Sequence, residues 1–163
     1  MTTTLFTNAH IATGEPGSTA ASTLPLQDIL VTDGVFTAFG PGLAQQYEAQ
    51  GGDLAAIEVV DLGGKLVCPP FCDTHLHLYY VFTARKPGAV NESGTLFEGI
   101  QRWSETKSDL TVDEIKQRAK IGIKKEMLHG VQLIRSHADV TDPNLTSLKA
   151  LLELKEELKD TVT

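Results

Sequence analysis

Two histidines stand one residue apart in the apolar stretch "FCDTHLHLYYVF", residues 71–82. Side chains alternate faces along an extended strand, so His75 and His77 project from the same face, together with Asp73. Two neutral imidazoles held close on one rigid face can share a metal ion, and imidazole is a common ligand of zinc, iron and copper. The alternative is a hydrogen-bonded, inert pair of polar residues at a strand end. The spacing alone does not decide between the two.

A second set of polar residues alternates along the segment "VQLIRSHADV", residues 131–140. On a strand, Arg135, His137 and Asp139 share one face. One interpretation is that they contact metal-ligating side chains and hold them in position, or that they orient a substrate. The other, which we favour slightly, is a buried structural cluster in which the arginine and the aspartate neutralise each other.

The composition narrows the class of protein. The chain has 163 residues, 41% of them hydrophobic, and a formal net charge of -7. An acidic chain is a poor partner for nucleic acid or for an anionic membrane, and we expect neither. No apolar run approaches the ~20 residues of a membrane span, and the start lacks the features of a secretory signal.

The two cysteines, Cys68 and Cys72, are too few for a disulfide framework. We expect both to be reduced packing residues in a cytoplasmic protein.

Residues 1–69 have the pattern of part of an N-terminal β-sandwich module. Asp33-Gly34 separates two β-rich runs and predicts a hairpin, while Gly63-Gly64 separates two further short strands. Residues 14–25 are predicted to be a polar loop, and a short helix is expected within residues 41–56.

Residues 70–163 alternate between strand and helix patterns. A strand at residues 71–78 is followed by two helices, which begin at the capping patterns Thr95-x-x-Glu98 and Thr111-x-x-Glu114. Another strand at residues 131–140 leads into an amphipathic helix at 144–159. This order predicts an α/β fold: the first βα units of a (β/α)8 barrel, incomplete here because such a barrel needs about 250 residues.

Other residues are assigned by their position alone. Phe97, Ile100 and Trp103 are expected to face a core, and His10 and His129 are expected to be ordinary structural histidines. Leu96 follows the long loop after the first barrel strand and is a candidate to touch a substrate.

The chain resembles the amidohydrolase superfamily, and within it the cytosine deaminase branch, over residues 65–159. The stretches that carry the resemblance are "LVCPPFCDTHLHL", "SGTLFEGIQRW", "LTVDEIKQRA" and "GVQLIRSHADVTDPNLTSLKALLELKEEL". Triazine hydrolases share a similar second strand. Tyr79 and Tyr80 depart from the pattern, because they stand where small polar or acidic residues are expected.

The resemblance implies a role for each candidate. His75 and His77 would be two ligands of a zinc or iron ion. A third histidine, an aspartate and the acid/base residues would come from later strands, which this chain does not contain. Asp73, Arg135, His137 and Asp139 would support the site, and Leu96 would contact the substrate.

The function expected from the resemblance is that of part of a metal-dependent hydrolase. It would deaminate or hydrolyse C–N bonds of a small cytosine-like heterocycle through a metal-activated water. The alternative is a non-catalytic half-barrel that needs a partner chain. In either case we expect the remaining half of the barrel to come from a second chain or a C-terminal remainder. The chain alone is expected to be inactive and oligomeric.

Overall fold

The computed structural model describes residues 2–12 and 24–163, so most of the loop expected at 14–25 lies outside the described residues. The chain divides into two compact units, Met1–Pro69 and Pro70–Thr163. Within the described residues, no helix is both long and apolar enough to cross a membrane.

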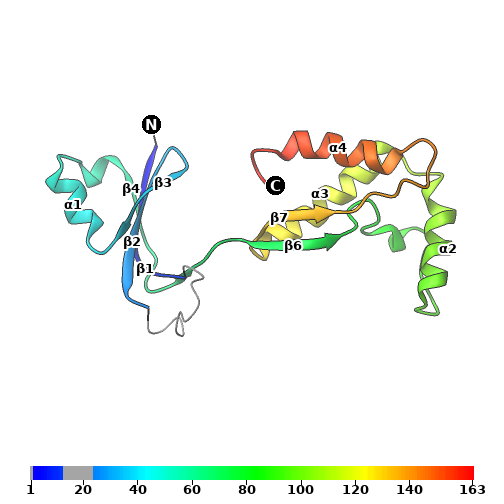
Figure 1. Ribbon diagram of the computed structural model, residues 1–163, viewed down its shortest axis with the longest axis horizontal. Helices are drawn as coiled ribbons and strands as arrows, with labels where there is room; N and C mark the ends of the chain where they lie inside the picture. The colour runs from blue at the N-terminus through cyan, green and yellow to red at the C-terminus, as the bar shows by residue number, and fades with distance from the viewer. Residues whose placement is uncertain (1, 13–23) are drawn as a thin grey trace. The chain divides into compact units, whose positions relative to one another are not determined.

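The first unit is a single mixed sheet of five strands with a short helix against it (Figure 1). Its elements are β1 (Thr3–Ile11), β2 (Leu26–Thr32), β3 (Val35–Gly40), α1 (Leu43–Ala49), the 3-10 turn η2 (Leu54–Ala56), β4 (Glu58–Asp61) and β5 (Leu66–Val67). The strand order is β3-β2-β1-β4, and β5 also pairs with β1. Leu5, Ala9, Ile29 and Leu43 are buried and form its core. These strands make one layer, so the sandwich expected here stays a prediction.

Both predicted turns of the first unit are confirmed. β2 and β3 pair antiparallel around Asp33 and Gly34, whose φ angles are 49° and 78°. Positive φ at both central residues gives the twist that joins two neighbouring strands, and Asp-Gly is a preferred pair for it. Gly63 and Gly64 likewise have φ angles of 56° and 79° between β4 and β5.

The second unit has the predicted order of strands and helices. It contains β6 (Phe71–Leu76), the 3-10 turn η3 (Thr83–Arg85), α2 (Leu96–Lys107), α3 (Val112–Leu128), β7 (Val131–Ser136) and α4 (Thr146–Leu158). β6 and β7 pair parallel, as expected of a βα unit, and lie side by side in Figure 1. The backbone of Thr163 bonds to Gln132 and Ile134, so the chain returns to the other edge of β7.

Helices α3 and α4 supply the core of this unit. Ile115, Ala119 and Ile123 of α3 are buried, and they lie in clusters with Ala150 and Leu154 of α4. Alanine at the contact lets two helices approach closely. The two predicted helices are therefore packed together through small and branched side chains rather than through a continuous leucine seam.

The two predicted capping patterns have different outcomes. At α3, Thr111 and Glu114 form the complete reciprocal box. At α2, the Thr95 hydroxyl accepts from the Glu98 amide at 3.3 Å, but the Glu98 carboxylate bonds to the preceding loop instead of to Thr95. Helix α2 is therefore capped by the Thr95 hydroxyl alone, and the carboxylate of Glu98 is available to anchor the preceding loop.

Two expectations about burial are wrong. Phe97 and Ile100 are 83% and 53% exposed, because no described element covers their face of α2; Trp103 is half-buried beside the cluster of Leu110 and Ile115. Cys68 and Cys72 are exposed, not packing residues. Cys72 pairs with Leu133 across the sheet, and that leucine is also exposed.

Replacing Ile115 with alanine is expected to lower the free energy of unfolding by about 2–5 kcal/mol, because this side chain is 1% exposed and its loss leaves a cavity. Denaturant unfolding followed by circular dichroism measures the change. Ile121→Ala is the control in the same helix, since Ile121 is 47% exposed and its loss should cost far less. Equal losses in the two variants would contradict the assignment of this core.

Candidate metal centre

Three histidines meet where the two parallel strands end. His75 lies in β6, His77 follows the end of that strand, and His137 directly follows β7. One ligand nitrogen of each lies within 4.8 Å of the others. Because parallel strands end at the same edge of a sheet, the pairing of β6 with β7 brings the predicted H-x-H pair together with a histidine 60 residues further along the chain.

The geometry of the three rings suits a shared cation. The Nε2 atoms of His75 and His77 are 3.1 Å apart, and the ring of His137 stacks on both, with centroids at 4.3 Å and 5.0 Å. Nδ1 of His137 is buried and has no hydrogen-bond partner among the described residues. Three imidazoles, one with an unpartnered nitrogen, are a donor set that fits zinc or iron.

Hydrogen bonds donated by backbone amides fix the strand ends that carry these rings. The carboxylate of Asp73 accepts from the amide of His75 at 2.9 Å, which gives this predicted supporting residue a definite contact. The amide of His137 donates to the carbonyl of Leu76 at 2.8 Å, and Ser136 Oγ accepts from the Leu78 amide at 3.2 Å. The parallel pairing thus continues up to the histidines themselves.

The electrostatics favour a neutral ring at His77. Burial lowers the pKa of His77, and the imidazoles of His137 and His75 lower it further, because a second positive charge so close is unfavourable. Neutral imidazole is the form that binds a metal.

Tyr79, Tyr80 and Trp103 pack together beside His77 and form an aromatic wall. The hydroxyl of Tyr79 lies 3.0 Å from His77 Nδ1, and the Tyr79 ring packs on Trp103 with centroids 5.0 Å apart. Burial raises the pKa of Tyr79, and the negative charge of Asp139 raises it further, so the hydroxyl keeps its proton. Tyr80 packs on the same indole edge-on, at 5.4 Å.

Asp139 has partners that differ from the one expected. It accepts from Trp103 Nε1 at 2.6 Å and from Thr141, and it forms an ion pair with Lys107 at 3.4 Å. Burial alone would raise the pKa of Asp139, but these hydrogen bonds and the lysine outweigh it and hold the pKa at about 2. The expected pair of Asp139 with Arg135 is wrong, because Arg135 remains exposed on β7 while α2 supplies the cation.

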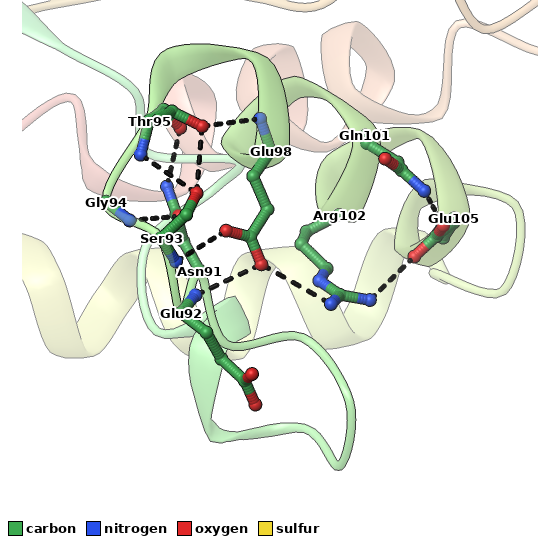
Figure 2. Close-up of polar contacts among 9 residues, drawn as sticks. All are labelled: Asn91, Glu92, Ser93, Gly94, Thr95, Glu98, Gln101, Arg102 and Glu105. Atoms are coloured by element: carbon green, nitrogen blue, oxygen red, sulfur yellow. Dashed lines mark hydrogen bonds and ion pairs between the residues drawn. The ribbon is translucent and has the colours of Figure 1, made fainter.

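The loop that leads into α2 is tied down by one carboxylate. Figure 2 shows Glu98 pointing back toward the loop, where it accepts from the amides of Glu92 at 3.1 Å and Ser93 at 2.6 Å. Arg102 contacts the same carboxylate at 3.4 Å. Leu96, the predicted substrate contact, is 75% exposed at the start of the helix, and its role stays a prediction.

The structure brings several of the predicted site residues together and adds partners that the sequence did not predict. Asp73, His75, His77, His137 and Asp139 all lie in or beside it. Trp103, Lys107 and Ser136 were not predicted as parts of this site, and Tyr79 was predicted only to lie near its mouth, as a departure from the family pattern. For Tyr79 a signal existed, since residues 75, 77 and 79 continue the same alternation. The others come from elements whose packing the sequence does not specify.

A βα unit with histidines at the carboxyl ends of parallel strands is the arrangement of metal-dependent hydrolases with a barrel fold. Comparison with known families agrees. The model of the amidohydrolase family matches residues 58–153, more than half of the chain, and the chain belongs to this family. Members of the family in general depend on a bound metal.

Two curated proteins of known activity are similar in sequence to this chain. N-isopropylammelide isopropyl amidohydrolase from Pseudomonas sp. (strain ADP) is 34% identical over 107 residues, which cover 63% of this chain and 27% of that protein. Hydroxydechloroatrazine ethylaminohydrolase from the same strain is 36% identical over 84 residues, or 50% of this chain and 17% of that protein.

Among solved structures, 5-methylcytosine deaminase from Klebsiella pneumoniae, liganded with 5-fluorocytosine, is 36% identical with a TM-score of 0.76. It matches 97% of this chain, and this chain spans 34% of it. The fold is therefore that of the first part of an amidohydrolase barrel with its preceding β-module.

Replacing Glu98 with glutamine is expected to release the loop before α2, because a neutral amide accepts more weakly from the amides of Glu92 and Ser93. Hydrogen exchange at those two amides, followed by NMR, should become several-fold faster. Glu105→Gln is the control, since Glu105 shares Arg102 but does not contact the loop. Unchanged exchange in Glu98→Gln would contradict the anchoring role.

The same contact predicts a pH dependence. Hydrogen bonds from Ser93 and Glu92 lower the pKa of Glu98 from 4.5 to about 2. Because the folded-state pKa is depressed, the contribution of Glu98 to stability is present above about 4.5 and is lost as the pH falls through about 2. The carboxyl carbon shift of Glu98 should titrate accordingly, and a midpoint near 4.5 would contradict the contact.

Proposed function

We propose that this chain carries the metal-binding edge of a hydrolase that acts on a C–N bond of a small cytosine-like heterocycle. The observation that supports this is the cluster of three imidazoles at the carboxyl ends of β6 and β7. The similar proteins described above are a deaminase, an aminohydrolase and an amidohydrolase, and their activities support this reaction class.

His75 and His77 would hold the ion, zinc or iron, through their Nε2 atoms, which already lie 3.1 Å apart. A bound divalent metal makes a water molecule acidic enough to act as a nucleophile near neutral pH. His137 stacks on both rings. It would either keep the two rings in place, the supporting role expected from the sequence, or add a third nitrogen, which the sequence did not predict.

Other residues of this chain would shape the space around the ion. Tyr79 and Trp103 form an aromatic surface beside His77 on which a planar ring can lie. Asp139, held ionised by Trp103 and Lys107, adds a fixed negative charge behind that surface. Leu96, exposed at the start of α2, is the proposed apolar contact of the substrate.

A second candidate is a metal-binding half-barrel without turnover of its own. It is favoured by the make-up of the cluster, in which three histidines are joined by no carboxylate among the described residues. The chain spans only 34% of the deaminase structure it matches. In both cases we propose that the other strands of the barrel, from the same or a second chain, complete the site.

Removal of His75 and His77 together, by substitution with alanine, is expected to reduce bound zinc or iron at least tenfold, because the chelating pair is lost. Elemental analysis after dialysis measures the metal. His129→Ala is the control, since that histidine bonds to a carbonyl at the end of α3 and lies outside the cluster. Retention of metal by the double variant would refute the ligand assignment.

His137→Ala in the same assay separates its two roles. A ligand role predicts a loss of metal comparable to that of either single variant, His75→Ala or His77→Ala. A purely supporting role predicts a smaller loss.

The chain alone is expected to self-associate, because large apolar side chains remain in contact with water. Leu96, Phe97 and Leu128 are 75%, 83% and 74% exposed. Light scattering on the purified chain measures the association, and Phe97→Glu is expected to reduce it. A monodisperse monomer with a cooperative thermal transition would contradict this expectation.

A further inference from the structure

The hydroxyl of Tyr79 faces the nitrogen of His77 that points away from the histidine cluster. It lies 3.0 Å from Nδ1, while Nε2 of the same ring faces His75 Nε2 at 3.1 Å. The two nitrogens of His77 therefore have separate partners. Only one of them can carry the proton in a neutral ring, so the partner of Nδ1 influences which nitrogen is free to bind a metal.

Tyr79 is itself held from three directions. Its ring packs on Trp103, whose indole nitrogen is fixed by Asp139 at 2.6 Å. Its carbonyl accepts from Arg118 Nη2 at 3.4 Å, and Arg118 Nε also donates to the Val81 carbonyl at 3.1 Å. Leu78, the residue before it, is buried in the core against α3. A phenol so restrained presents its oxygen in one place.

We propose that Tyr79 is a positioning residue that accepts the Nδ1–H of His77 and so keeps Nε2 of that ring unprotonated for the metal. This inference rests on the proposed metal centre. It gives a function to Tyr79, a residue that departs from the pattern of the cytosine deaminase branch. A fixed hydroxyl can accept this proton without adding a negative charge next to the cluster.

The chain offers a matched pair of variants. Tyr79→Phe removes the hydroxyl and keeps the ring that packs on Trp103. Tyr80→Phe makes the same chemical change in the neighbouring residue, which also packs on Trp103. Tyr80 contacts the cluster through its backbone, whose amide donates to the His77 carbonyl at 2.9 Å, and Tyr80→Phe keeps this bond. In the described part of the chain, the Tyr80 hydroxyl makes no hydrogen bond to the three histidines. Any effect of losing a phenol from this aromatic wall in general would therefore be seen in both variants.

Two readouts test the inference on the 163-residue chain. The first is the tautomer of His77, read from two-bond proton–nitrogen NMR correlations at a pH where the ring is neutral, with His77→Ala to assign the signal. The wild-type chain and Tyr80→Phe should show the Nδ1–H form. Tyr79→Phe should shift His77 toward the Nε2–H form. The second is the affinity for Co²⁺ alone, followed by its visible absorption, which should weaken roughly tenfold in Tyr79→Phe only.

The outcomes are distinguishable. An Nε2–H form of His77 in the wild-type chain, or an unchanged tautomer in Tyr79→Phe, would overturn the role of Tyr79. Equal loss of Co²⁺ affinity in both tyrosine variants would also overturn it, because the effect would then belong to the aromatic wall. Failure of the wild-type chain to bind Co²⁺ would count against the proposed metal function, while the tautomer comparison would still decide whether Tyr79 holds His77.

Discussion

The parallel pairing of β6 and β7 is the interaction on which the candidate site depends. Its register places Leu76 opposite Ser136, so the residues that follow both strands emerge at one edge. A hydrogen bond reinforces the pairing at each end. The Phe71 amide donates to the carbonyl of Gly130, and the His137 amide donates to the carbonyl of Leu76. A shift of two residues in this register would move His137 about 7 Å along the strand and separate it from the other imidazoles.

The helices fix the two-stranded sheet, and through it the site. α3 and α4 pack through Ala119 and Ala150, which are fully buried, and Lys116 of α3 is paired with Glu153 and Glu157 of α4. From the other side of α3, Arg118 reaches the carbonyls of the segment that carries Tyr79. The same helix therefore holds the core and the aromatic wall beside His77.

The carboxylate near the site is not neutralised by the histidines. Burial lowers the pKa of His77, and the neighbouring imidazoles of His137 and His75 lower it further. The nearby carboxylate of Asp139 is kept ionised by an indole, a threonine and a lysine rather than by the histidines. His77 is thus favoured in its neutral form, which is the form that binds a metal.

Much of the fold could be predicted from the sequence because its determinants are local. The alternation of side chains along a strand predicted that His75 and His77 share a face, and the positive φ that Asp-Gly allows predicted the β2–β3 hairpin. Thr111 and Glu114 predicted the start of α3, since a capping box involves only neighbouring residues. The order of strands and helices predicted a parallel pair.

Only the tertiary structure decided which distant groups meet. It brought His137 within ligand distance of the H-x-H pair, joined Asp139 to Lys107 and Trp103 instead of Arg135, and placed the Tyr79 hydroxyl on His77. It also left Phe97 and Ile100 exposed, although their spacing resembles that of a core face. The sequence determined which face of each element a side chain occupies. What covers that face depends on the packing of other elements, and periodicity within one element carries no information about it.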